Sequence, residues 1–132
     1  MTEPVDDQGL IDTAREAALA AYAPYSGFRV GAAVLSADGR IFSGANVENA
    51  AYPSSNCAEA TAVGTAVTAG ARKIEVVAVA CIDAPSVDLA YPCGRCRQIL
   101  NEFDTERVLV TTAAEEVREH TLGELLPHAF KL

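Results

Sequence analysis

Cys57-Ala58-Glu59 and Pro92-Cys93-Gly94-Arg95-Cys96 are the two segments that decide the fold of this 132-residue chain. Each is followed by apolar residues at helical spacing, so each predicts a helix with cysteine at its start. The partial positive charge at a helix N-terminus favours the thiolate form of such a cysteine and prepares it to bind a cation. The sequence therefore predicts thiolates at the starts of two helices.

Three of these cysteines fit a catalytic zinc site. Catalytic zinc commonly has three protein ligands and leaves its fourth position to water, which then gives up a proton near neutral pH. Glu59 lies two residues beyond Cys57 and could take and return that proton. The signature His-x-Glu followed by Pro-Cys-x-x-Cys is typical of zinc deaminases, and Cys57 takes the place of the histidine. We predict one Zn²⁺ held by Cys57, Cys93 and Cys96, with Glu59 as the catalytic residue.

The same residues leave other interpretations open. A Cys-x-x-Cys alone is also typical of a redox pair or of a structural zinc site, and Glu59 could simply favour the helix dipole. A structural site needs a fourth ligand, and none stands out. Cys81 lies in an apolar strand and is interpreted as a buried thiol. His120 and His128 stand alone near the C-terminus and are interpreted as surface or packing residues.

Composition limits the class of protein. Eighteen acidic against ten basic residues give a net charge of −8, which disfavours a polynucleotide partner. No stretch approaches membrane-spanning length, and residues 1–9 lack the pattern of a signal peptide. We therefore expect a cytoplasmic protein without nucleic-acid or membrane partners, whose reduced cysteines serve metal binding or catalysis. Its length and half-hydrophobic composition predict a single domain over residues 1–132.

Hydrophobic periodicity and turn residues predict a mixed sheet flanked by helices. The predicted helices cover residues 9–22, 57–68, 93–103 and 122–126, with Pro92 at the first position of the third. The predicted strands cover residues 28–36, 40–47, 74–82 and 107–112, and 116–119 could extend the sheet. The Asp-Gly connection at 38–39 indicates a hairpin, and the apolar run 74–82 is typical of a central strand.

Five blocks of the chain resemble the cytidine deaminase family in its short, single-domain, homotetrameric form. They are residues 23–33, 46–53, 57–59, 92–98 and 125–130, in family order. The resemblance implies an α/β fold, a three-layer α/β/α sandwich with a five-stranded mixed sheet. It also implies hydrolysis of cytidine or deoxycytidine to the uracil nucleoside with release of ammonia, as in pyrimidine salvage.

The resemblance assigns roles around a nucleoside substrate. Glu59 would pass a proton to N3 of the base and then protonate the departing amine. Phe28 would face the base, the Ala58 backbone N–H would contact it, and Asn46 and Glu48 would hold the ribose hydroxyls. An aromatic face suits a flat base, and side chains two residues apart in an extended segment point the same way. From chemistry alone, Phe28 could equally belong to the core and Asn46 could stabilise a turn.

The resemblance also implies contacts between subunits of a homotetramer. Tyr52 and Phe130 would reach the pocket of a neighbouring subunit. The alternative interpretations are an ordinary loop tyrosine and a C-terminal packing phenylalanine.

One position departs from the family pattern. Many members have an arginine directly after the catalytic glutamate, whereas this chain has Ala60. Three thiolates around Zn²⁺ leave a net negative cluster that needs compensation by cations or N–H dipoles. Arg95 and Arg97 are the candidates to supply this charge, and each could instead be a solvent-facing arginine.

Three competing functions remain. Deaminases of cytosine-nucleoside antibiotics such as blasticidin S share both cysteine motifs, although Phe28, Asn46 and Glu48 favour an ordinary nucleoside. A non-catalytic, zinc-stabilised binding module would have no use for Glu59 at an open coordination position. Thiol redox exchange at Cys93 and Cys96 would produce a reversible disulfide and no bound metal.

Overall fold

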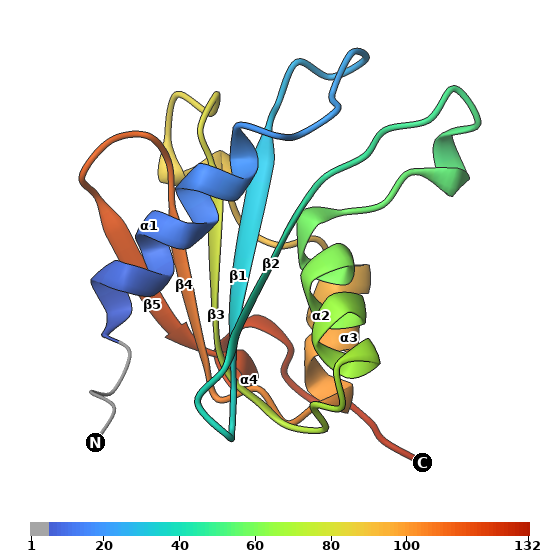
Figure 1. The fold of residues 1–132 in the computed structure, drawn as a ribbon, viewed down its shortest axis with the longest axis vertical. Helices are drawn as coiled ribbons and strands as arrows, with labels where there is room; N and C mark the ends of the chain where they lie inside the picture. Colours follow the sequence, from blue (N-terminus) through green and yellow to red (C-terminus); the bar gives the residue numbers. More distant parts are fainter. Residues whose placement is uncertain (1–5) are drawn as a thin grey trace.

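A computed structural model describes residues 6–132, which form a five-stranded sheet in the order β2-β1-β3-β4-β5 (Figure 1). The prediction that residues 1–9 are not a signal peptide rests partly on residues 1–5, which lie outside the described residues. The elements are α1 (Asp7–Ala18), β1 (Val30–Ser36), β2 (Ile41–Ala45), η1 (Tyr52–Ser54), α2 (Ala58–Thr68), β3 (Ile74–Cys81), η2 (Val87–Leu89), α3 (Gly94–Glu102), β4 (Arg107–Thr111), β5 (Val117–Thr121) and α4 (Leu122–Leu125), where η marks a 3₁₀ helix.

The sheet is mixed, as predicted. β3 pairs antiparallel with β1 and parallel with β4, while β2 and β5 form antiparallel edges. α1 covers one face, and α2 with α3 covers the other, which gives the expected three layers (Figure 1). Alternate residues of β3 contribute to the two cores, so its nearly continuous apolar run is explained by burial on both faces. Among the described residues, no helix is long and apolar enough to span a bilayer.

Two glycines let the helices approach the sheet closely. A Cβ atom on Gly31 would lie 2.0 Å from the carbonyl oxygen of Ala14 in α1. A Cβ atom on Gly44 would lie 2.6 Å from the backbone nitrogen of Ala62 in α2. Each helix backbone therefore rests directly on a strand, and α2 is fixed in the position that presents its N-terminus to the site described below.

The first helix differs from its prediction. It ends at Ala18 rather than near Tyr22, and it begins at Asp7, where the Asp6 carboxylate accepts a hydrogen bond from the Gly9 N–H at 2.7 Å. The Tyr22 N–H donates to the Asn46 carbonyl, and the Tyr22 carbonyl accepts from the Glu48 N–H. These tertiary backbone bonds draw the chain out of the helix despite its helical side-chain spacing.

The position predicted for Pro92 is also wrong. α3 begins at Gly94 with Cys93 as its N-cap residue, so Pro92 precedes the helix. The Pro92 carbonyl accepts a hydrogen bond from Arg97 Nε at 2.8 Å, which holds the chain against the first turn from outside. Strand boundaries differ from their predictions by at most two residues.

Candidate metal and substrate site

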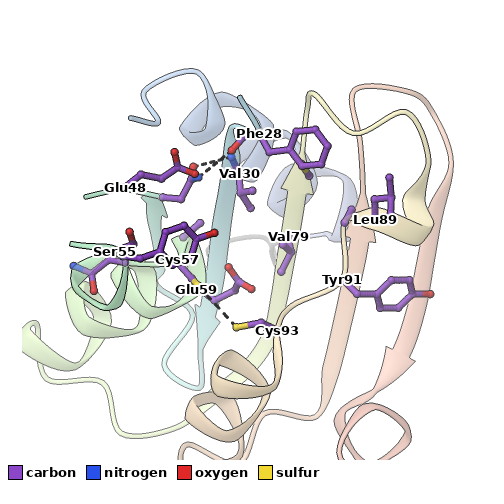
Figure 2. Close-up of a pocket in the computed structure, with 16 residues that line it drawn as sticks. Phe28, Val30, Glu48, Ser55, Cys57, Glu59, Val79, Leu89, Tyr91 and Cys93 are labelled. Atoms are coloured by element: carbon purple, nitrogen blue, oxygen red, sulfur yellow. Dashed lines mark hydrogen bonds between the residues drawn. The ribbon is translucent and has the colours of Figure 1, made fainter. Parts of the chain in front are cut away.

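A pocket of about 260 Å³ opens where α2 and α3 begin, at the carboxyl end of β3 (Figure 2). Its volume is slightly below the roughly 300–1,000 Å³ usual for drug-sized ligands, so it suits a small molecule. The predicted site residues line this pocket, with the exceptions of Cys96 and Phe130. Segments far apart in the sequence therefore meet here as expected.

Three cysteine sulfurs gather at the inner end of the pocket, which two of them, those of Cys57 and Cys93, line directly. The Sγ atoms of Cys57, Cys93 and Cys96 all lie within 4.8 Å of one another, and those of Cys57 and Cys93 are 3.9 Å apart. Zn–S bonds of about 2.3 Å in a tetrahedron imply sulfur–sulfur distances of about 3.8 Å. Cys57 and Cys93 are the N-cap residues of α2 and α3, yet neither side chain forms a capping hydrogen bond. The three thiols therefore fit one zinc ion.

The thiols differ in acidity because they lie so close together. The neighbouring Cys96 thiol lowers the pKa of Cys57 to about 6 against the effect of burial, and Cys93 and Arg95 lower it further. The pKa of Cys96 moves in the opposite direction, chiefly through its interaction with Cys57 and through burial. The close approach of the three sulfurs and the charge of Arg95 therefore favour the thiolate form of Cys57.

The two candidate arginines are used differently. Arg95 is exposed on the first turn of α3, and its charge contributes to the lowered pKa of Cys57. Arg97 donates from Nε to the Pro92 carbonyl and from Nη1 to the Leu125 carbonyl, each at 2.8 Å. Arg97 thus ties the start of α3 to the C-terminal segment, and Arg95 is the arginine that acts on the thiols.

Glu59 is a buried carboxyl beside this cluster. It lies in the first turn of α2, and its exposed fraction is only 4%. Burial raises its pKa to about 7, and the nearby Cys57 charge raises it too, while its own backbone N–H and the Cys96 thiol oppose the rise. Figure 2 shows its side chain inside the pocket near Cys57 and Cys93. A carboxyl that titrates near neutral pH can both take and release a proton.

Asn46 and Glu48 line the outer part of the pocket and also hold its backbone together. Asn46 accepts from the Val30 N–H at 2.8 Å and donates to the Phe28 carbonyl at 3.0 Å. One Glu48 oxygen accepts from two backbone N–H groups, at 2.9 and 3.1 Å, and contacts with Ser26 lower the Glu48 pKa. Among the described residues, no hydrogen bond engages the second Glu48 oxygen, which can accept from a ligand hydroxyl.

The remaining predicted residues fall into two groups. Phe28 and Ala58 line the pocket, and Ala58 is the first residue of α2, where a backbone N–H has no helical partner. Tyr52 lines the pocket of its own chain with 78% of its surface exposed. Phe130 is 66% exposed and lies outside the pocket, with its carbonyl hydrogen-bonded to α3 side chains. Within one chain, the structure therefore brings all of these residues together except Phe130.

Several pocket residues were missed from the sequence. Cys81, interpreted as a buried thiol, is indeed only 2% exposed, but it also lines the pocket. The alternation of Val79 and Cys81 on the α2 side of β3 could have indicated this. Leu89 and Tyr91 line the pocket from the segment before α3, and no motif marks them.

Comparisons with known proteins identify the family of this chain. The model of the cytidine and deoxycytidylate deaminase zinc-binding region matches residues 4–112. A cytidine deaminase of Halalkalibacterium halodurans is 45% identical over 129 residues, covering 96% of this chain and 95% of that protein. A cytidine deaminase of Mycobacterium tuberculosis is 43% identical over 128 residues, covering 97% and 92%.

Solved structures agree as well. The crystal structure of a cytidine deaminase from Burkholderia pseudomallei superposes with a TM-score of 0.86 at 43% identity, covering 96% of this chain and 100% of that one. Because the family match includes both cysteine motifs and the relatives align over nearly their whole length, this chain belongs to the cytidine and deoxycytidylate deaminase family, whose domain binds zinc.

Proposed function

We propose that this protein hydrolyses cytidine and deoxycytidine to uridine and deoxyuridine and releases ammonia, as a step of pyrimidine salvage. The observation that carries the proposal is the buried Glu59 carboxyl beside three thiols, at the inner end of a small pocket. Relatives named cytidine deaminase support the same reaction. The net charge of −8 and the pocket volume of about 260 Å³ favour a free nucleoside over a polynucleotide.

The polarity of the pocket orients the nucleoside. Asn46 and Glu48 would receive the ribose hydroxyls at the outer end, which places carbon 4 of the base towards the cysteines. Phe28 would face the base, and the free N–H of Ala58 would hydrogen-bond to its edge. These contacts hold the reacting carbon next to Glu59.

The reaction requires proton transfers that Glu59 can perform. Cys57, Cys93 and Cys96 would hold a zinc ion, which when bound would lower the pKa of a water and so supply a nucleophile near neutral pH. Glu59 accepts one proton of that water and passes it to N3. It then passes the second proton to the exocyclic amine, so that the carbon–nitrogen bond breaks and ammonia leaves. Its pKa of about 7 suits both transfers.

An absorbance assay tests this function directly. Zinc-replete protein should abolish the cytidine absorption band, while Glu59→Gln, with equal zinc content, should leave it unchanged. If wild-type protein changes neither cytidine nor deoxycytidine, the proposal fails. The same assay with blasticidin S would then separate an antibiotic deaminase from a zinc-stabilised binding module, and a reversible disulfide between Cys93 and Cys96 would indicate thiol exchange.

We propose further that residues 1–132 act as one catalytic domain in a cytoplasmic homotetramer. The exposed Tyr52 and Phe130 are available for a neighbouring subunit, and a reducing compartment would keep the cysteine ligands reduced. Light scattering gives the oligomeric state. Mixing the inactive Glu59→Gln protein with inactive Phe130→Ala protein should restore part of the activity if Phe130 completes a neighbour's pocket.

A further inference from the structure

One side of the pocket is formed by residues 86–91, here called the wall segment. It contains η2 and ends two residues before Cys93. Leu89, Ala90 and Tyr91 line the pocket from this segment. Figure 2 shows Leu89 and Tyr91 across the pocket from Cys57, with the Tyr91 hydroxyl pointing away from Glu59. No residue of the wall segment has a role in the reaction proposed above.

Two side-chain contacts fasten the wall segment to the edge strand β5. The Tyr91 hydroxyl and His120 Nε2 are 2.7 Å apart, and their ring centroids are 5.3 Å apart. Three residues before Tyr91, the Asp88 carboxylate forms an ion pair with Arg118, which lowers the pKa of Asp88. Arg118 and His120 lie two positions apart in β5, so they project from the same face of that strand. β5 therefore holds the wall segment at two points.

The contact at His120 is itself oriented from behind. His120 Nδ1 lies 3.3 Å from a carboxylate oxygen of Glu124. Glu124 is fixed by the capping box at the start of α4, which it forms with Thr121. A carboxylate only accepts, so the network assigns the proton of a neutral His120 to Nδ1 and leaves Nε2 to accept from the Tyr91 hydroxyl. Along this chain of contacts, the Tyr91 hydroxyl therefore donates to His120, and His120 donates to Glu124.

The position of the wall segment matters for the base of the substrate. In a pyrimidine, N3 and carbon 5 flank carbon 4 on opposite sides of the ring. A base that presents N3 to Glu59 on α2 therefore turns carbon 5 away from α2. The wall segment lies on that side of the pocket, opposite Cys57 (Figure 2).

We propose that Arg118 and His120 are positioning residues that set the distance of the wall segment from carbon 5 of the base, and thereby limit the size of the 5-substituent that the enzyme accepts. This inference rests on the proposed deamination of cytosine nucleosides. The Tyr91 contact is partly buried, whereas the Asp88–Arg118 pair is exposed and screened by solvent. His120 therefore contributes more than Arg118.

Selectivity between cytidine and 5-methylcytidine tests the proposal. Tyr91→Phe keeps the ring but removes the hydroxyl, and His120→Ala removes its partner. Each should raise the ratio of kcat/KM for 5-methylcytidine to that for cytidine about fivefold, a small part of the discrimination that one methyl group can give. Arg118→Ala should raise the ratio only about twofold, because solvent screens an exposed ion pair.

Matched controls separate positioning from general stability. Glu116→Gln removes the other carboxylate partner of Arg118, at 3.0 Å, without touching the wall segment, and should leave the ratio unchanged. His120→Gln retains a side-chain acceptor and should restore most of the wild-type ratio. If His120→Ala does not fold, Tyr91→Phe, which lacks a single oxygen, still decides the question.

Hydrogen–deuterium exchange gives a second measurement that needs no turnover. Exchange across residues 86–91 should accelerate in Tyr91→Phe and His120→Ala but not in Glu116→Gln. The selectivity ratio and the exchange rate must change together, and a change in only one of them, or in neither, overturns the proposal. Wild-type protein inert towards both nucleosides would overturn the proposed function, whereas normal turnover of cytidine with an unchanged ratio overturns only the role of the wall segment.

Discussion

The inner and outer ends of the pocket use their polar side chains in different ways. At the inner end, the side chains of Cys57 and Cys93 form no capping hydrogen bonds at the starts of their helices. The Glu59 carboxyl is buried, which disfavours its charged form. At the outer end, Asn46 and Glu48 each bind two backbone groups around the pocket. Substitution of Glu59 should therefore reduce activity and spare stability, whereas substitutions at the outer end should reduce both.

Removing a cysteine ligand should have the largest effect. Cys57→Ala should lose bound zinc and reduce kcat/KM roughly a thousandfold or more, because the activated water is lost with the metal. Metal analysis beside the absorbance assay measures both quantities. Cys81→Ala, which changes a thiol of the same pocket outside the cluster, is the control and should keep its zinc. Equal zinc content in the two variants would contradict the assigned ligand set.

Glu59→Gln should separate chemistry from folding. Loss of the proton-transfer group should lower kcat by roughly a hundredfold to ten-thousandfold. The zinc content should be unchanged, and the melting temperature should be equal to or above that of the wild type, because a neutral amide has a smaller cost of burial than a carboxylate. A clear fall in melting temperature would show that the inner end also supports the fold.

Asn46→Ala should affect both properties. It leaves the Val30 N–H and the Phe28 carbonyl without their partner, which should cost about 1–3 kcal/mol of the free energy of unfolding. The KM for cytidine should rise as well, because the ribose loses a contact. Urea unfolding and steady-state kinetics measure the two effects. Wild-type stability in this variant would break the contrast between the two ends.

The smallest expected effect is a pH-dependent change in stability that arises from the pair of Arg29 and Asp83, next to the start of β1. Hydrogen bonds from Arg29 lower the pKa of Asp83 to about 2, from an ordinary value of 3.8, and tie the residue after Phe28 to the loop after β3. A depressed carboxyl pKa adds stability that is present above pH 3.8 and is lost as the pH falls through 2.

The variant Arg29→Ala tests this linkage. Its urea midpoint should lie slightly below that of the wild type at pH 6, and the difference should shrink as the pH is lowered from 4 towards 2. Lys73→Ala, which breaks an exposed ion pair far from the pocket, is the control. A difference that stays constant with pH would exclude Asp83 as its source.

Each of the two motifs at the inner end was predictable because its information is local, and the zinc requirement for three ligands predicted that they meet. Cys57 with Glu59, and Cys93 with Cys96, lie within one helical turn of a recognisable helix start, so spacing in the sequence fixes spacing in the fold. The five-stranded mixed sheet was likewise expected, and it is confirmed by the strand order and by the relatives of known structure. The roles of Phe28, Asn46 and Glu48 came from family resemblance and remain predictions.

The errors occurred where contacts between distant segments override local preference. Helical spacing continues to Tyr22, but backbone bonds to Asn46 and Glu48 end α1 at Ala18. Pro92 suits a first helical position, but it lies before α3. α1 ends where the chain forms bonds to remote residues, and Pro92 is held by Arg97, which is itself bonded to the distant Leu125; no local pattern encodes these contacts.

The sequence by itself determined the chemistry of this protein: three thiols, one carboxyl and the helices that begin beside them, since short-range geometry follows from backbone periodicity. Only the tertiary structure decided that Arg95 rather than Arg97 acts on the thiols. It also decided that Asn46 holds the backbone around the pocket that it lines, and that β5 holds the wall segment. These features depend on side chains that meet across elements far apart in the chain, and their partners are set by how the layers pack.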